Sequence, residues 1–213
     1  RSSDLDPESK RVLTTGNPDK AYFNIPDYLR FLGTINQDES VQSLTPRLLD
    51  RAAIINFDDF EPNYEISVVG SENILDVNPE AISGRRFIDI FKANSLEVPA
   101  DIEKVLQSVV MTLRDDRPEY GNPIIISYRK IKAIRSYYNV AGPLMSMESK
   151  YLGLDYAVCQ HVIPLLNGYG QGFGKRLEAL ILNLPDEMDK SLRMLRRILS
   201  HGNQHMFSYG HNL

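Results

Sequence analysis

The spacing of apolar residues between positions 101 and 113 limits the fold more than any other feature of the sequence. A helix with one apolar side must cover that side with other elements. The sequence therefore predicts a helix here that belongs to a larger helical layer. The apolar positions fall three and four residues apart, as on one side of an α-helix: Ile102, Val105, Leu106, Val109, Val110 and Leu113.

Further helices are predicted across the carboxyl-terminal half. Ser127 is a typical N-cap residue and precedes apolar residues at helical spacing, which include Ile134 and Tyr138. The carboxyl-terminal half is thus expected to be mostly helical. The other predicted helices run from about Asp155 toward Pro164, over residues 173 to 183, and from near Pro185 to a stop before Gly202.

The amino-terminal part has a different pattern. YLRFLGTIN, residues 28 to 36, and AAIINF, residues 52 to 57, are short apolar runs bounded by polar residues, and each predicts a buried strand. Between them, Pro46 suits the first position of a short helix. The order strand, loop, helix, strand is typical of an α/β sheet, which binds ligands beyond the carboxyl ends of its strands.

Composition excludes several classes of protein. The 24 Lys and Arg against 28 Asp and Glu give a net charge of −4, so any contact with nucleic acid needs a local basic patch. The single cysteine, Cys159, suits a reducing compartment. Apolar runs long enough to span a bilayer and a signal-peptide core are both missing. We therefore expect a cytoplasmic protein with no membrane contact.

Polar residues at the end of the first predicted strand are candidates for phosphate chemistry. The amide of Asn36 could hold a water molecule against a phosphate, although Asn is also common in turns at strand ends. Arg47 and Arg51 lie four residues apart and project from one side of the short helix. They could reach a phosphate, or Arg51 could pair with Asp50 or Asp58.

Two other motifs favour structural interpretations. NGYGQGFGKR, residues 167 to 176, lacks the glycine and the final Ser or Thr of a phosphate loop, so we expect a flexible connection between helices. Cys159 and His161, and the histidines near the carboxyl end, lack the regular spacing of a zinc site, so we expect no metal site.

The last predicted helix carries a basic side. Lys190, Arg193, Arg196 and Arg197 lie opposite its apolar residues. A solvated helix face explains them, and a contact with nucleic acid or another partner is the alternative.

FLGTINQDES, LTPRLLDR and INFD together resemble the second half of an AAA+ ATPase core, in the group of McrB-like, MoxR-like and dynein-related ATPases. ISYRKIKAIRSYYNVA and GLDYAVCQHVIPLL resemble helices of the lid domain that follows such a core. The resemblance covers residues 22 to 60 and 124 to 166. It departs from the family pattern at LDRAA, where LDRF or LxRRF is commoner.

The resemblance implies an α/β fold, with the last strands of a P-loop AAA+ core followed by a mainly α-helical lid. It divides the chain into core (1–60), a linking segment or insert (61–98) and lid (99–213). It assigns Asn36 as sensor 1, Arg51 or second Arg47 as the arginine finger, and Arg129 as sensor 2. The resemblance implies that the intact parent forms a ring, hydrolyses ATP or GTP with Mg, and remodels a protein or DNA substrate.

Neither a phosphate loop nor a magnesium-binding acidic strand occurs in this sequence. We therefore expect negligible hydrolysis and no tight nucleotide binding by this chain alone. The alternative function is an interaction or regulatory module that never hydrolyses nucleotide, with nucleic acid bound through the basic last helix as a further hypothesis.

Overall fold

The computed structural model describes residues 12–13, 23–24, 29–35, 44–56, 83–92, 95–147, 149–201 and 206–208. The chain divides into two compact units, which we describe separately. One comprises residues 1–35 and 65–92, and the other, here called the helical unit, comprises residues 36–64 and 93–213. The predicted domain boundary at residue 60 lies outside the described residues, so the three predicted domains stay a prediction.

The first unit contains little regular structure among its described residues. Strand β1 (Val12–Leu13) pairs antiparallel with β2 (Phe23–Asn24), and helix α2 (Gly84–Phe91) begins after Ser83, whose hydroxyl accepts a hydrogen bond from the Arg86 amide. The prediction of a buried strand over residues 28 to 36 is wrong for its described part. Residues 29–35 form no strand, and Leu32 is 99% exposed, because no neighbouring strand covers it among the described residues.

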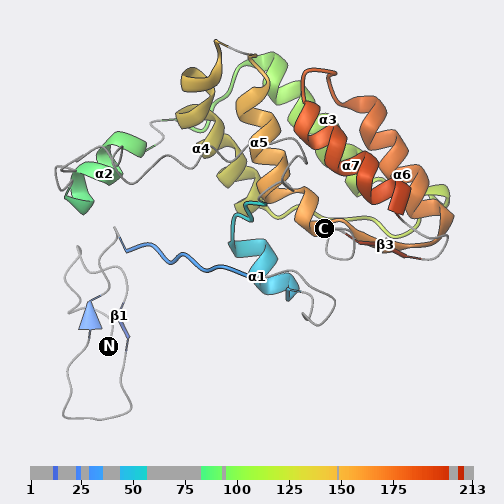
Figure 1. Ribbon diagram of the computed structural model, residues 1–213, viewed down its shortest axis with the longest axis horizontal. Coiled ribbons are helices and arrows are strands. Elements are labelled where there is room, and N and C mark those ends of the chain that lie inside the picture. Colours follow the sequence, from blue (N-terminus) through green and yellow to red (C-terminus); the bar gives the residue numbers. More distant parts are fainter. Residues whose placement is uncertain are drawn as a thin grey trace, which may run out of the picture. The chain divides into compact units, whose positions relative to one another are not determined.

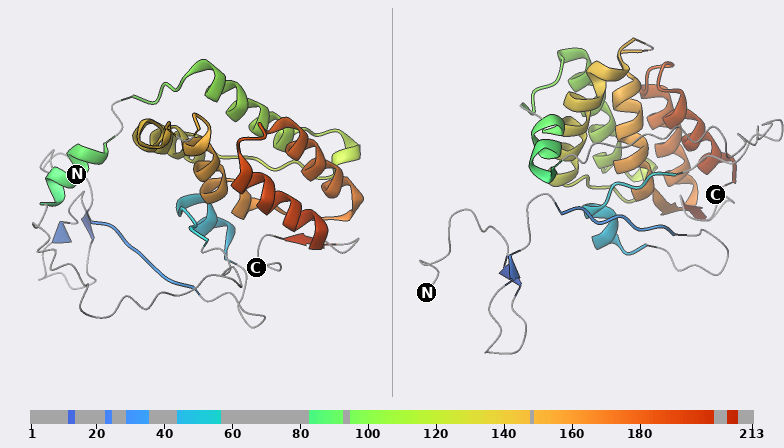
Figure 2. Two further views of the ribbon diagram at one scale, coloured as in Figure 1. Left: turned by 45° about the horizontal axis from the view of Figure 1, so that its top comes forward. Right: turned by 60° about the vertical axis from the view of Figure 1, so that its left-hand side comes forward.

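Helices α3 to α7 form the body of the helical unit, and Figures 1 and 2 show them packed side by side. Helices α4 and α5 contact each other closely, α6 lies against α3 and α7, and α7 also contacts α5. The predicted helices are confirmed, each to within a few residues. The bounds are α3 (Ala100–Arg114), α4 (Tyr128–Met145), α5 (Leu152–His161), α6 (Gly170–Asn183) and α7 (Asp189–His201).

The apolar stripe of residues 102–113 lies in the core. Ile102, Leu106, Val109 and Leu113 of α3 are each at most 2% exposed. They join buried residues of the other four helices in one hydrophobic cluster. No helix among the described residues is both long enough and apolar enough to cross a bilayer.

The glycine-rich segment differs from its prediction as a flexible connection. Residues Asn167–Tyr169 form β3, which pairs antiparallel with β4 (Met206–Ser208), and α6 begins at Gly170. A Cβ atom at Gly168 would overlap the Phe173 ring, and one at Gly172 would lie 2.8 Å from the Gly121 amide. Glycine is therefore needed here for close contact, and the prediction of a flexible connection is wrong.

Short elements complete the helical unit. Helix α1 (Pro46–Arg51) contacts α4 and the 3₁₀ turn η3 (Ile163–Leu165), and the turn η2 (Pro118–Tyr120) contacts α6. The described residues after α1, 52–56, form no strand, so the second strand prediction is also wrong over them. Instead the Ile54 amide donates to the Gln160 carbonyl at 3.1 Å, which lays this segment against the end of α5.

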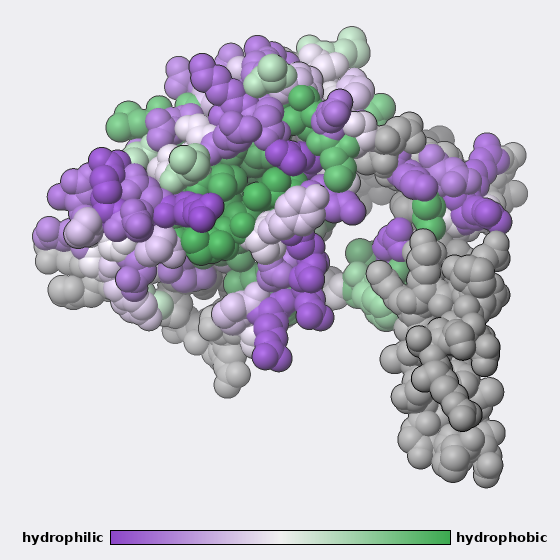
Figure 3. All heavy atoms as spheres, turned by 180° about the vertical axis from the view of Figure 1, so that it is seen from behind, coloured by the Kyte–Doolittle hydropathy of each residue, from purple (hydrophilic) through white to green (hydrophobic). Residues whose placement is uncertain are grey.

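One face of the helical unit exposes apolar surface. Figure 3 shows an apolar area with hydrophilic residues around it. Exposed apolar side chains of this unit include Met111, Ile125 and Leu182, which are 68%, 65% and 84% exposed. Apolar surface surrounded by polar residues is typical of a contact surface.

Candidate functional site

Helix α1 presents two of the predicted site residues to solvent. Its sequence defines its amino-terminal end, because Thr45 caps it through a hydrogen bond from the Leu48 amide at 3.4 Å and Pro46 occupies its first turn. Leu49 is buried and anchors the helix. Arg47 and Arg51 are both exposed, and their spacing of four residues places them on one side of the helix.

The amino-terminal end of α4 lies against this helix and carries the third candidate, Arg129. Ser127 caps α4 by accepting from the Lys130 amide at 3.3 Å, as predicted. The Ser127 hydroxyl also donates to Asp50 Oδ1. Arg129 Nη1 donates to Asp50 Oδ2 at 2.6 Å. Asp50 therefore joins α1 to the first turn of α4.

The partners of Asp50 keep its carboxylate charged. The hydrogen bond from Ser127 lowers the pKa of Asp50 most, and the positive charges of Arg129 and Lys130 lower it further. Since Asp50 pairs with Arg129, the structure does not show the alternative in which Arg51 pairs with Asp50. The other alternative partner, Asp58, lies outside the described residues.

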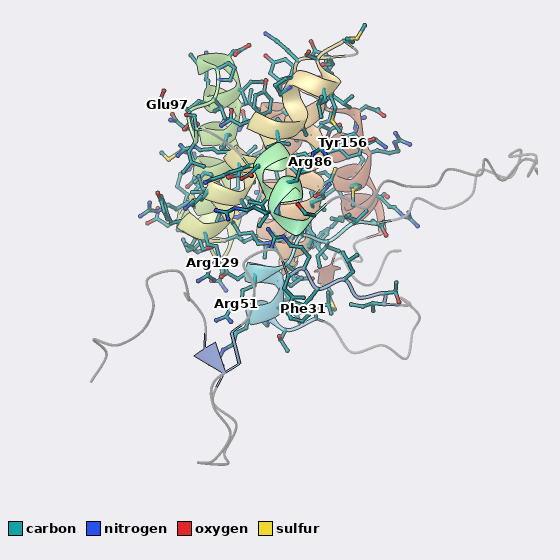
Figure 4. The ribbon with its side chains drawn as sticks, turned by 90° about the vertical axis from the view of Figure 1, so that its left-hand side faces the viewer. Phe31, Arg51, Arg86, Glu97, Arg129 and Tyr156 are labelled. Atoms are coloured by element: carbon teal, nitrogen blue, oxygen red, sulfur yellow. The ribbon has the colours of Figure 1, made fainter. Side chains whose placement is uncertain are left out.

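The arginines of α1 and α4 lie on one side of the helical unit. Figure 4 shows the labelled Arg51 and Arg129 projecting toward the same side, from elements that are far apart in the sequence. The Arg129 side chain is 61% exposed. Guanidinium groups that project into solvent can bind phosphate oxygens in pairs. This surface, here called the arginine face (Arg47, Arg51 and Arg129), is our candidate functional site.

A buried lysine holds the chain next to the arginine face in place. Lys130 is 2% exposed, and its Nζ donates to the Ala52 carbonyl at 2.7 Å, which holds the chain just after α1. Burial lowers the pKa of Lys130, and the charge of Asp50 opposes this. The position of α1 thus depends on two contacts from the first turn of α4, one from Arg129 and one from Lys130.

His161 is a second buried titratable group in this region. It ends α5 and is 8% exposed, and its buried Nδ1 has no hydrogen-bond partner among the described residues. Burial lowers the pKa of His161 to about 4, and the positive charge of Lys130 contributes to the same shift. His161 is therefore neutral at physiological pH.

The structure does not bring all the predicted site residues together. Asn36 lies outside the described residues, so its assignment as sensor 1 stays a prediction. Arg51 and Arg129 project toward the same side, and Arg47 lies one turn before Arg51 on α1. Sequence alone did not indicate Asp50 as the link between α1 and α4. The sequence feature that could have indicated Asp50 is its position between Leu49 and Arg51, at the end of a six-residue helix.

Sequence reasoning also missed two buried charged residues. Arg176 is fully buried, and Asp155 is 1% exposed. Both lie on apolar helix stripes, Arg176 between Phe173 and Leu180, and Asp155 beside Leu154 and Val158. A charged residue within an apolar stripe is the signal that could have identified them, since such groups are buried only when they are paired.

Asp155 caps α7 from the neighbouring helix α5. Its carboxylate accepts from the Lys190 amide at 2.9 Å and from the Ser191 amide at 2.7 Å. These amides belong to the first turn of α7, where a helix has unpaired N–H groups and a positive dipole end. Asp155 therefore contributes both hydrogen bonds and charge to the contact of α5 with α7.

We expect Asp155→Asn to lower the free energy of unfolding by about 1 to 2 kcal/mol, because one of the two acceptor oxygens becomes an NH₂ donor that faces an amide. Urea denaturation at pH 7 measures this change. Asp186→Asn, at an exposed position just before α7, serves as the control and should change stability by less than about 0.5 kcal/mol. Equal stability of the two variants would contradict the capping role.

The cysteine and the basic last helix have structural contacts. Cys159 Sγ lies 3.4 Å from the Ser191 hydroxyl. On α7, Arg193 donates to Asp189 at 2.6 Å and the Lys190 ammonium lies 4.9 Å from the centre of the Tyr156 ring. These contacts agree with a solvated helix face, and nucleic-acid binding by α7 stays a prediction.

Comparison with known proteins places most of the helical unit in a family. No curated protein and no solved structure matches the chain. One family model matches residues 77–207, which include helices α2 to α7 but not α1. The chain belongs to the family described as a domain of unknown function (DUF8727).

Proposed function

We propose that this chain is the carboxyl-terminal part of an AAA+ nucleotide-driven motor, in which the arginine face contacts nucleotide phosphates. The parent would hydrolyse ATP or GTP with Mg as a ring, in a restriction or remodelling system. Arg129 would approach the phosphates of its own subunit as sensor 2. Arg51, or else Arg47, would reach the site of the neighbouring subunit as the arginine finger.

The observation that carries the proposal is the joint exposure of Arg51 and Arg129 on one side of the helical unit. The proposal requires both arginines to be near nucleotide phosphates, and Asp50 brings the two segments that bear them into contact. The exposed ion pair of Arg129 with Asp50 is worth at most about 1 kcal/mol, so a phosphate group can replace Asp50 at modest cost. The phosphate loop and the acidic strand would come from another part of the parent.

Mutations in the intact parent test the proposal. We expect Asn36→Ala to lower turnover about a hundredfold while nucleotide affinity stays the same, because a sensor 1 residue acts on the attacking water. Arg51→Ala should cause a loss of similar size, whereas Arg47→Ala should matter less if Arg51 is the finger. Steady-state hydrolysis and equilibrium binding of a fluorescent nucleotide measure both quantities.

Arg114→Ala provides the matched control, because Arg114 is an exposed arginine at the end of α3, in the same unit. Its turnover should equal that of the unmodified parent. Unchanged turnover in both Asn36→Ala and Arg51→Ala would contradict the motor proposal. A parent sequence without GxxxxGK[ST] upstream of this chain would do the same.

A second candidate function is a module that binds partners and does not hydrolyse nucleotide. It is favoured by the pairing of Arg129 with Asp50, which leaves the charge of this arginine already balanced, and by the exposed apolar area of Figure 3. Under this alternative, the parent would lack hydrolysis, and Asn36→Ala would have no effect on any activity. The hydrolysis assay therefore separates the two candidates.

A further inference from the structure

A small pocket lies between residues 54–56 and the helices α5 and α7. Its volume is about 80 Å³. One water molecule needs about 10 to 15 Å³ of such volume, so the pocket has room for roughly five to eight water molecules. A ligand group of that size is a single ring. The lining residues are Ile54, Ile55, Asn56, Tyr156, Cys159, Gln160, Lys190, Arg193 and Met194.

The lining combines apolar and polar chemistry as ligand sites do. Ile54, Ile55 and Met194 supply apolar surface for a ring, and Asn56 and Gln160 supply amide groups that can both donate and accept hydrogen bonds. The backbone hydrogen bond from the Ile54 amide to the Gln160 carbonyl fixes one wall to the end of α5. Because its walls come from three elements tied together by such contacts, the pocket is held in shape.

Two cations give the pocket a preference for anions. Lys190 and Arg193 both line it, on the first turns of α7. The Arg193 and Asp189 side chains are 62% and 71% exposed, so the ion pair between them is weak and an anionic ligand can compete with it. The Lys190 and Ser191 amides already donate to the Asp155 carboxylate. The positive charge that faces a ligand therefore comes from the Lys190 and Arg193 side chains.

We propose that this pocket binds a small anion that carries one apolar ring, such as an aromatic carboxylate or an aryl phosphate. The ring contacts Ile54, Ile55 and Met194, and the anionic oxygens face Lys190 and Arg193. A long polyanion fits less well, because exposed carboxylates of Asp186, Glu187 and Asp189 precede and begin α7 and the chain has a net charge of −4. The pocket shares no residue with the arginine face, so this site is independent of the proposed motor function.

Titration of the ¹⁵N-labelled chain, followed by amide chemical shifts, tests the proposal. Benzoate supplies the ring with a carboxylate, and phenyl phosphate supplies it with a phosphate. We expect at least one of them to cause saturable shifts at residues 54–56, 156–160 and 190–194 at millimolar concentration. Saturation by only one of the two probes identifies the anionic group that the site prefers.

Phenol and inorganic phosphate separate the two halves of the ligand. Each should bind at least about tenfold more weakly than the better combined probe, because each lacks either the charge or the ring. The absence of saturable shifts with benzoate and with phenyl phosphate would overturn the proposal. Binding of phenol as tight as that of both anions would overturn the role of the cations.

Matched variants on α7 test whether Arg193 contacts the anionic ligand. Arg193→Gln should raise the half-saturating concentration of the better probe about tenfold, since a charge-assisted contact is lost. Arg196→Gln changes an exposed arginine of the same helix that does not line the pocket, and should leave that concentration unchanged. Equal affinities of the two variants would contradict the contact with Arg193.

Cys159 offers an independent readout, since it is the single cysteine of the chain and lines the pocket. A bound ring should slow its alkylation by iodoacetamide several-fold in the unmodified chain, with the same half-saturating concentration as in the titration. If Cys159 reacts in the absence of the better probe and reacts equally fast in its presence, the ligand binds elsewhere. That result would overturn the proposed site.

Discussion

Replacing Arg176 by methionine should lower the free energy of unfolding by about 3 to 5 kcal/mol, the usual cost of breaking a buried charged network. Arg176 is fully buried and lies on α6. Its guanidinium donates to five backbone carbonyls. These are the carbonyls of Thr112, Leu113 and Asp115 at 2.7 Å, and those of Tyr120 and Gly121 at 3.2 Å.

The accepting carbonyls explain the size of this effect. Those of Thr112 and Leu113 belong to the last turn of α3, where carbonyls lack helical partners and the helix dipole is negative. Arg176 therefore caps α3, fixes the turn that contains η2, and holds both against α6. Methionine fills a similar volume but donates no hydrogen bond, so it leaves several of these carbonyls unpaired and buried.

Denaturation by guanidinium chloride, with Arg176→Lys as a second variant, measures the effect. Lysine keeps the charge but has only one nitrogen, so we expect an intermediate loss of about 2 kcal/mol. Lys175→Met changes the preceding exposed residue of α6 and serves as the control. A loss below about 1 kcal/mol in Arg176→Met would show that the carbonyls find other partners.

Acidification should destabilise the chain through His161 by about 2 kcal/mol at pH 5 and about 3 kcal/mol at pH 4, relative to pH 7. The pKa of His161 is about 4 in the folded chain and ordinarily 6.5. Between these values the unfolded chain binds more protons than the folded chain. Stability therefore falls as the pH falls through this range, and above it His161 is neutral in both states.

Comparison with His161→Leu isolates this contribution. Carboxylates with lowered pKa values, such as those of Asp50 and Glu103, also lose stabilisation in acid, but they do so in both proteins. We expect the stability of His161→Leu to depend less on pH by the amounts given above. Urea denaturation at several pH values measures the difference.

A histidine replaced elsewhere, in His211→Leu, controls for the general loss of a titrating group. Parallel curves of stability against pH for the unmodified chain and His161→Leu would contradict this contribution, because they would mean that protonation of the buried His161 side chain costs no stability.

Local sequence pattern predicted the helices well because each contains its own signal. Helix α3 repeats apolar residues at helical spacing, Ser127 caps α4, and Pro46 begins α1, and these features act within a few residues of the chain. The strands at residues 28 to 36 and 52 to 57 were not found in the described residues. A strand depends on neighbours that a local pattern does not contain.

The candidate site was predicted in part for the same reason. The spacing of Arg47 and Arg51 predicted that they project from one side of α1, but the contacts of Asp50 with Ser127 and Arg129 join residues 77 and 79 positions apart. No local pattern specifies such pairs. Asn36, the residue on which the motor proposal most depends, awaits the mutational test.

The sequence by itself determined where the helices of the helical unit run and which of their sides are apolar, because the backbone period and the apolar spacing are local properties. The tertiary structure alone decided what the buried charged residues contact. Arg176, Asp155 and Lys130 look like surface residues by type, yet each is buried because its partners are backbone groups brought close by the packing of other elements. Those partners are far away in the sequence, and only the folded chain brings them together.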